Sequence, residues 1–102
     1  MSSQSNDSSE IKIFQTSIFV KKVKKLTKNQ RKDLDQAIKK IRDNPLIGKQ
    51  KKGDLVSTWV YKFKMVKQEY LLAYQWDENT RTLIALGVHE NFYRDLKKYN
   101  KS

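Results

Sequence analysis

Hydrophobic and polar residues alternate from Val56 to Val66, as they do in a half-buried β-strand. Successive side chains in a strand point to opposite faces, so one face carries the large apolar residues Trp59, Tyr61, Phe63 and Met65. The other face carries Thr58, Val60, Lys62 and Lys64. Two more runs rich in β-branched and aromatic residues follow, Glu69 to Trp76 and Thr82 to Val88. The polar stretch Asp77–Thr80 between them has turn-forming residues, so we expect an antiparallel three-stranded meander.

Apolar residues recur at helical spacing in the segment before this meander. Phe19, Val23 and Leu26 form one stripe, behind Thr16 or Ser17 as a helix N-cap. Thr27–Gln30 has the form of a capping box, and it precedes a second stripe made of Leu34, Ala37, Ile38 and Ile41. This second helix should end at Asn44–Pro45, because proline disfavours the helical conformation of the residue before it. The pattern predicts an antiparallel helical hairpin packed on the sheet.

The remaining segments complete an α+β fold. Ile11 to Phe14 is a short β-like run, and it predicts an N-terminal strand beside the meander. Residues 46–54 read as a glycine- and lysine-rich loop, and Glu90 to Lys101 as a short C-terminal helix. We therefore expect the order β-α-α-β-β-β plus that helix, in one domain over residues 11–102. Residues 1–10 are polar and should form a disordered tail.

Charge is distributed unevenly along the chain. The formal net charge is +11, and residues 12–52 hold 14 of the 22 basic side chains but only 3 of the 11 acidic ones. A basic half of this kind predicts a polyanionic partner, such as nucleic acid or the ribosome, or an acidic protein. A solvated lysine-rich surface is the alternative interpretation.

Several classes of protein are excluded or disfavoured by composition. The chain has no cysteine and one histidine, so it can form neither a disulfide scaffold nor a thiolate or histidine-cluster metal site. No apolar run is long enough for a membrane span, and residues 1–10 lack the features of a signal peptide. We therefore expect a cytoplasmic protein with no membrane association, metal or small-molecule cofactor.

Candidate chemistry gathers around the single histidine. His89 lies where the third run of the meander ends, and Tyr93 follows one helical turn later. Lys62 and Lys64 lie together on one strand face, and Arg81 and Arg94 are near His89 in sequence. RNA cleavage through the ribose 2′-OH needs a base, an acid and cations at the phosphate, and these residue types supply them. A lone histidine at a strand end is more often a surface residue than a catalyst. Lys62 and Lys64 could equally mark the solvent face of the sheet, and Tyr93 could serve packing instead of function.

The phrases VYKFKM, EYLLAYQW and LIALGVHENFYRDL, together with the predicted order of elements, resemble the RelE/ParE superfamily of bacterial type II toxins. The resemblance covers about residues 12–99. Its most specific features are the pair Lys62 and Lys64, the aromatic strand after it, and Gly87 followed by His89. The RelE-like branch cuts mRNA in the ribosomal A site, whereas the ParE-like branch has the same fold and inhibits DNA gyrase.

The resemblance implies roles for individual residues. Lys62 and Lys64 would act on the scissile phosphate, His89 would be the acid or base, and Tyr93 would orient the nucleotide. Arg81, Arg94 and Lys52 would contact phosphates. The basic helical hairpin would dock on ribosomal RNA; its phosphate-contact candidates are Lys21, Lys22 and Lys25. RelE-like toxins often have an arginine where this chain has Leu71, so Arg81 or Arg94 would have to replace that charge.

The expected function is thus a type II toxin that cleaves mRNA on the ribosome and is neutralised by an antitoxin with an acidic binding segment. Two alternatives remain open at this point. One is a gyrase inhibitor without nuclease activity, and the other is a non-catalytic RNA-binding module.

Overall fold

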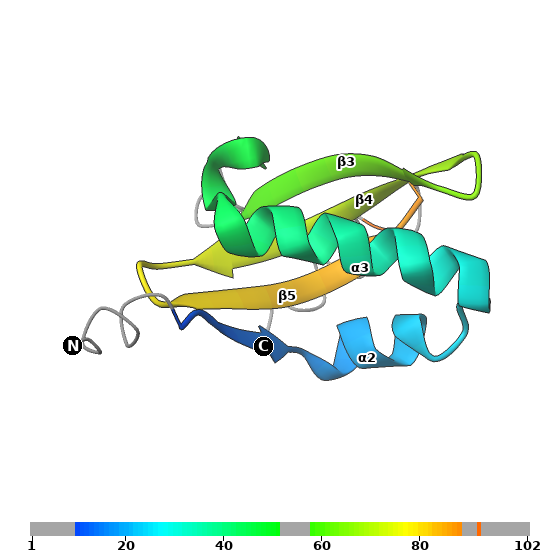
Figure 1. The fold of residues 1–102 in the computed structure, drawn as a ribbon, viewed down its shortest axis with the longest axis horizontal. Coiled ribbons are helices and arrows are strands. Elements are labelled where there is room, and N and C mark those ends of the chain that lie inside the picture. The colour runs from blue at the N-terminus through cyan, green and yellow to red at the C-terminus, as the bar shows by residue number, and fades with distance from the viewer. Residues whose placement is uncertain (1–9, 52–57, 89–91, 93–102) are drawn as a thin grey trace.

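The computed structural model describes residues 10–51, 58–88 and 92. A five-stranded sheet in the order β1-β5-β4-β3-β2 forms its centre (Figure 1). The strands are β1 (Lys12–Gln15), β2 (Lys49–Gln50), β3 (Trp59–Met65), β4 (Gln68–Trp76) and β5 (Thr80–Gly87). The pairs β2–β3, β3–β4 and β4–β5 are antiparallel, whereas β1 lies parallel to β5. The predicted meander, the N-terminal strand and the α+β class are confirmed.

Both predicted helices are present, and local capping sets where they begin. Helix α2 (Ser17–Val23) starts at Thr16, whose Oγ1 accepts the N–H of Phe19 at 3.2 Å. Helix α3 (Lys28–Asp43) starts at Thr27, and the capping box with Gln30 is formed in both directions, at 2.9 and 3.2 Å. Asn44 ends α3, as expected for a residue before proline.

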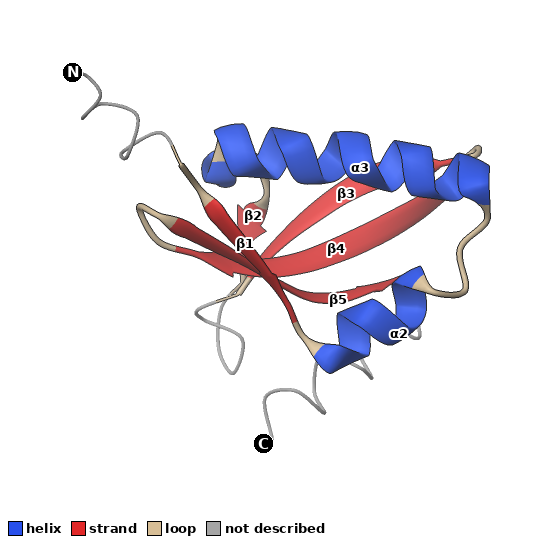
Figure 2. Ribbon diagram, turned by 60° about the horizontal axis from the view of Figure 1, so that its bottom comes forward, coloured by secondary structure: helices blue, strands red, loops and turns tan. Residues whose placement is uncertain are grey.

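The sheet has two different faces. We call the side against α3 the helix face and the opposite side the lysine face (Figure 2). A core of Phe19, Val23, Leu34, Ile41, Met65, Leu72, Tyr74, Leu83 and Leu86 fills the helix face, with Trp59, Tyr61 and Phe63 packed against it. A smaller cluster on the other side contains Val60, Leu71, Ala73, Ile84, Ala85 and Phe92. The alternation predicted for β3 is therefore the one that the structure contains.

A two-residue turn joins β3 to β4, because Met65 pairs directly with Gln68. Val66 and Lys67 both have positive φ, 48° and 71°, as a type I′ hairpin turn requires. Such a conformation is unfavourable for a β-branched residue. The N–H of Val66 donates to Oδ2 of Asp33 on α3 at 2.8 Å, which ties the turn to the helix.

The segment after α3 differs from the loop that the sequence predicts. It forms a 3₁₀ turn, η1 (Pro45–Ile47), and then β2, which pairs antiparallel with the start of β3. Tyr74 of β4 causes this, because its hydroxyl donates to the carbonyl of Pro45 at 2.7 Å and accepts the N–H of Gly48 at 3.0 Å. A buried tyrosine thus holds the chain at the edge of β3.

Two predictions lie largely outside the described residues: the disordered tail over residues 1–10 and the helix over residues 90–101. Of the second segment the structure describes Phe92, which is fully buried and donates its N–H to the carbonyl of Val88 at 2.9 Å. Within the described part of the chain, no helix has the length and apolar character needed to cross a membrane.

Candidate functional site

Lys62 and Lys64 are exposed on the lysine face, as their alternation with apolar residues predicts. Lys62 is paired with Leu71 of β4, and Leu71 is paired in turn with Gly87 at the end of β5. Side chains of directly paired residues project from the same face, so this row runs from Lys62 to the last residue of β5. Lys64 is paired with Glu69 in the next row outward. Lys62 therefore lies level with the end of β5, from which the chain continues toward His89, and Lys64 lies one row beyond it.

A groove of about 500 Å³ opens beside Lys62. We call it the β2–β3 groove; its lining residues are Ile47, Lys49, Lys51, Val60, Tyr61, Lys62 and Leu71. Three of these seven residues are lysines, and none is acidic. Lys49 is paired with Val60, which places its side chain on the lysine face together with Lys62.

Lys49 and Lys51 are functional candidates that the sequence analysis missed. The run Lys49–Lys52 is basic, which is a signal of phosphate contact, but only Lys52 was selected from it. What could not be predicted is the pairing of β2 with β3, which brings Lys49 to the face of Lys62. Lys52 itself lies outside the described residues.

Tyr74 and Gly48 fix the position of Lys49. A Cβ atom on Gly48 would lie 2.6 Å from the hydroxyl oxygen of Tyr74 and 2.9 Å from the carbonyl oxygen of Val60. These distances are too short for any side chain, so glycine allows the backbone to approach closely here. Burial raises the pKa of the Tyr74 hydroxyl, which keeps it protonated as the donor to Pro45.

The helical hairpin contributes a second basic cavity, of about 260 Å³. Lys22 and Lys25 line it together with Leu26, Gln30, Tyr70, Leu86, Gly87 and Val88. Two of these lining residues are bonded to each other, because Gln30 Nε2 donates to the Tyr70 hydroxyl at 3.3 Å. Two of the three hairpin lysines selected from the sequence thus lie where β5 ends. Lys21 is exposed and is not among the lining residues.

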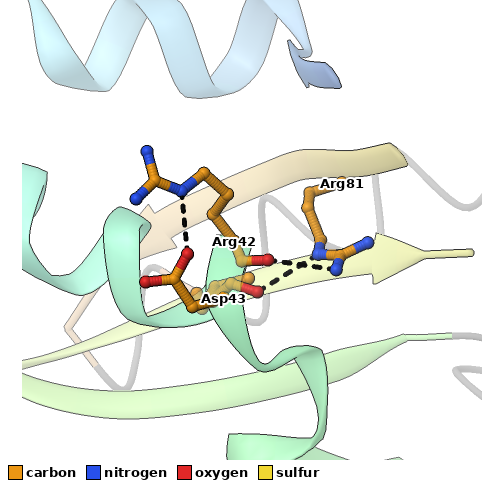
Figure 3. A network of polar contacts seen from close by, with 4 residues as sticks. Arg42, Asp43 and Arg81 are labelled. Atoms are coloured by element: carbon orange, nitrogen blue, oxygen red, sulfur yellow. Dashed lines mark hydrogen bonds and ion pairs between the residues drawn. The ribbon is translucent and has the colours of Figure 1, made fainter. Parts of the chain in front are cut away.

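Arg81 occupies a different place from the one that the resemblance implied. Arg81 is 4% exposed, and its guanidinium donates to the carbonyls of Ile41, Arg42, Asp77 and Thr80 at 2.7–3.1 Å. Figure 3 shows the guanidinium directed toward the backbone of Arg42 at the end of α3. It also lies 5.9 Å from the ring centroid of Trp76. β5 separates it from Gly87 by six residues, or about 20 Å. Arg81 therefore joins the end of α3 to the sheet, and this structural role replaces the expected phosphate contact.

Three further candidates, His89, Tyr93 and Arg94, lie outside the described residues, and their roles stay predictions. Among the residues that are described, no group of three or more histidine, cysteine, aspartate or glutamate side chains is placed to hold a metal ion. What the described site offers is a cationic surface: Lys62 and Lys64 beside a groove with two more lysines. Such a surface can bind a phosphate chain and stabilise charge on one of its phosphates.

Comparisons with known proteins agree with this fold. The family model that matches residues 13–97 describes a ParE-like toxin of a type II bacterial toxin–antitoxin system. No curated protein sequence matches the chain.

Among solved structures, a double arginine-to-alanine mutant of the Escherichia coli toxin RelE in the free state is similar with a TM-score of 0.68 and 21% identity, over 88% of this chain and 97% of that one. The RelBE2 toxin–antitoxin complex of Mycobacterium tuberculosis matches with a TM-score of 0.66 and 18% identity, over 78% and 99%. The intact E. coli RelBE complex matches with a TM-score of 0.62 and 24% identity, over 78% and 98%. At these identities the structural likeness establishes the fold.

Proposed function

Because the chain belongs to the ParE-like toxin family of type II bacterial toxin–antitoxin systems, we propose that it acts as a toxin by cleaving mRNA on the ribosome. The observation that carries the proposal is the position of Lys62 and Lys64. Both are exposed on the lysine face, and the row of paired residues from Lys62 reaches the end of β5, two residues before His89. Cations and a histidine are the groups that this reaction needs.

The reaction begins when a base removes the proton from the ribose 2′-OH. The 2′-oxygen then attacks the adjacent phosphorus, the bond from phosphorus to the 5′-oxygen breaks, and an acid protonates that oxygen. The products are a 2′,3′-cyclic phosphate and a 5′-hydroxyl. We assign one proton transfer to His89 because histidine titrates near neutral pH. Lys62 and Lys64 stabilise the charge on the phosphate oxygens, and Tyr93 orients the nucleotide.

Two partners follow from this proposal. The basic helical hairpin, with Lys21 and Lys25 exposed, contacts ribosomal RNA, so binding should weaken steeply with salt. The second partner is a cognate antitoxin, as in the RelBE complexes, with acidic residues that match the charge of +11.

Inhibition of DNA gyrase is the second candidate function. The family model that matches the chain describes ParE-like toxins. In the superfamily that the sequence resembles, the ParE-like branch inhibits DNA gyrase. In this function the lysines and His89 would have no catalytic role.

Primer extension on a defined mRNA in a purified translation system separates the two functions. We expect the wild-type protein to cut at A-site codons and His89→Ala and Lys62→Ala to cut at least a hundredfold more slowly. Lys12→Ala is the matched control, because Lys12 is an exposed lysine in β1 at the opposite edge of the sheet. If the wild-type protein leaves the mRNA uncut and blocks DNA supercoiling by gyrase, the proposed function is gyrase inhibition and not mRNA cleavage.

A further inference from the structure

We propose that the β2–β3 groove is a nucleotide subsite, which holds the RNA nucleotide next to the scissile phosphate and contacts its phosphate through Lys49. This inference rests on the proposed function, because Lys62 is shared between the groove and the catalytic surface. RNA held at Lys62 has the groove beside it and can continue into it.

The size and lining of the groove suit a nucleotide. Its volume of about 500 Å³ lies in the range of about 300–1,000 Å³ that is typical of small-ligand sites. Ile47, Val60 and Leu71 supply apolar contacts. Tyr61 also borders the groove, but its ring packs on the helix face, where it stacks on the ring of Phe63. Ligand pockets in proteins are lined mainly by apolar side chains, with a few charged groups that fix the orientation of the ligand, and the groove combines these two features.

The lysines are arranged to follow a phosphate chain. Lys49 is paired with Val60, and Lys62 is two residues farther along β3, so the two lysines are diagonal neighbours on the lysine face. Diagonal neighbours in a sheet are about 7–8 Å apart. Two charges at this separation can contact two different phosphates of one strand. Lys51 also lines the groove and adds to its positive potential.

The strand that carries Lys49 is held firmly. Gly48 is bound to the Tyr74 hydroxyl, the N–H of Lys51 donates to the carbonyl of Thr58 at 2.8 Å, and Lys49–Gln50 pair with β3 between these two points. A subsite whose backbone is fixed before binding loses little conformational freedom when RNA enters. An acidic protein segment is the competing occupant, and the experiment below includes it.

The test measures coupling between Lys49 and one phosphate of the RNA. A set of short, fluorescently labelled 2′-O-methyl RNAs is made, each with one phosphate replaced by an uncharged methylphosphonate. The 2′-O-methyl group prevents cleavage, so binding is measured separately from the proposed reaction. Fluorescence anisotropy then gives the affinity of the wild-type protein, Lys49→Ala and Lys12→Ala for each RNA.

We expect Lys49→Ala to weaken binding of the fully charged RNA about tenfold and to lower the salt slope by about 0.7. At one position of the RNA, a methylphosphonate should weaken binding to the wild-type protein about as much as Lys49→Ala does. The same RNA should bind Lys49→Ala no more weakly than the fully charged RNA does. Lys12→Ala should behave as the wild type. Equal affinity of Lys49→Ala and Lys12→Ala for every RNA, or no RNA binding by the wild type, would overturn the subsite.

Two additional measurements distinguish the possible failures. Weaker binding of an acidic peptide to Lys49→Ala, with RNA binding unchanged, would assign the groove to a protein segment. If the wild-type protein cleaves mRNA in the translation assay but no methylphosphonate position is coupled to Lys49, the subsite is wrong and the proposed function stands. Coupling at Lys49 without cleavage would remove the nuclease and leave a groove that binds RNA.

Discussion

The hydroxyl of Tyr74 accepts the backbone N–H of Gly48 at 3.0 Å, although the two residues are 26 positions apart. The same hydroxyl donates to the carbonyl of Pro45. Through these two bonds a buried side chain of a central strand sets the course of the connector after α3. The edge strand β2, the groove beside it and the position of Lys49 all depend on this contact.

Tyr74→Phe should lower the free energy of unfolding by about 1–3 kcal/mol, because it leaves the N–H of Gly48 and the carbonyl of Pro45 without their partner. Urea unfolding followed by circular dichroism measures the loss. Tyr70→Phe is the control, since the Tyr70 hydroxyl lies in a half-exposed position and accepts one bond at 3.3 Å from Gln30. An equal loss in both variants would contradict the special role of Tyr74.

The Tyr74 hydroxyl should also make stability depend on alkaline pH. Burial raises the pKa of Tyr74 above its ordinary value of 10.0, so the folded state favours the neutral phenol. Its contribution to stability is present below pH 10.0, where the unfolded phenol is also neutral, and is lost as pH rises through the folded pKa. Unfolding in urea at several pH values from about 8 to 11 should show the gap between wild type and Tyr74→Phe narrowing above pH 10. A difference in unfolding free energy between the two proteins that stays constant with pH would contradict a role for Tyr74 ionisation.

Arg81→Met should lower the free energy of unfolding by on the order of 3 kcal/mol, since four carbonyl contacts of a buried guanidinium are lost. Arg31→Ala is the matched control, because Arg31 is exposed and its ion pair with Asp35, at 3.6 Å, contributes less than about 1 kcal/mol.

Arg81→Met also distinguishes a structural role of Arg81 from a role in RNA contact. RNA affinity per folded molecule should be unchanged in Arg81→Met, because the side chain is buried away from the lysine face. A stable Arg81→Met protein with weakened RNA binding would restore the phosphate role that the resemblance implied.

Replacing Val66 by asparagine together with Lys67 by glycine should raise the free energy of unfolding by roughly 1–2 kcal/mol. Both positions have positive φ, and Asn-Gly is the preferred sequence for a type I′ turn. Val66 is 50% exposed, so little packing is lost. Thermal unfolding of the double variant measures the gain. The N–H of residue 66 should keep its bond to Asp33, so Asp33→Ala should cost both proteins the same amount; unequal costs would show that the turn had moved.

The sequence alone determined the elements whose signals are local. Thr16 and the Thr27–Gln30 box set the helix starts, Asn44–Pro45 ends α3, and the alternation in β3 decides which side chains face the helices. These features depend on residues within one turn of helix or one strand. The family resemblance, which rests on short phrases in the same segments, was correct for the same reason.

Only the tertiary structure decided the features that join distant parts of the chain. Arg81 was expected to contact a phosphate, but carbonyls 39 and 40 positions away at the end of α3 accept hydrogen bonds from its guanidinium, and the residue is buried. The connector was expected to be a loop, but the Tyr74 hydroxyl and the edge of β3 make part of it a strand. Charge and propensity are properties of single residues and short segments, whereas burial and hydrogen-bond partners depend on the packing of the whole fold. For that reason the sequence could indicate Lys62 and Lys64, while the groove with Lys49 beside them required the structure.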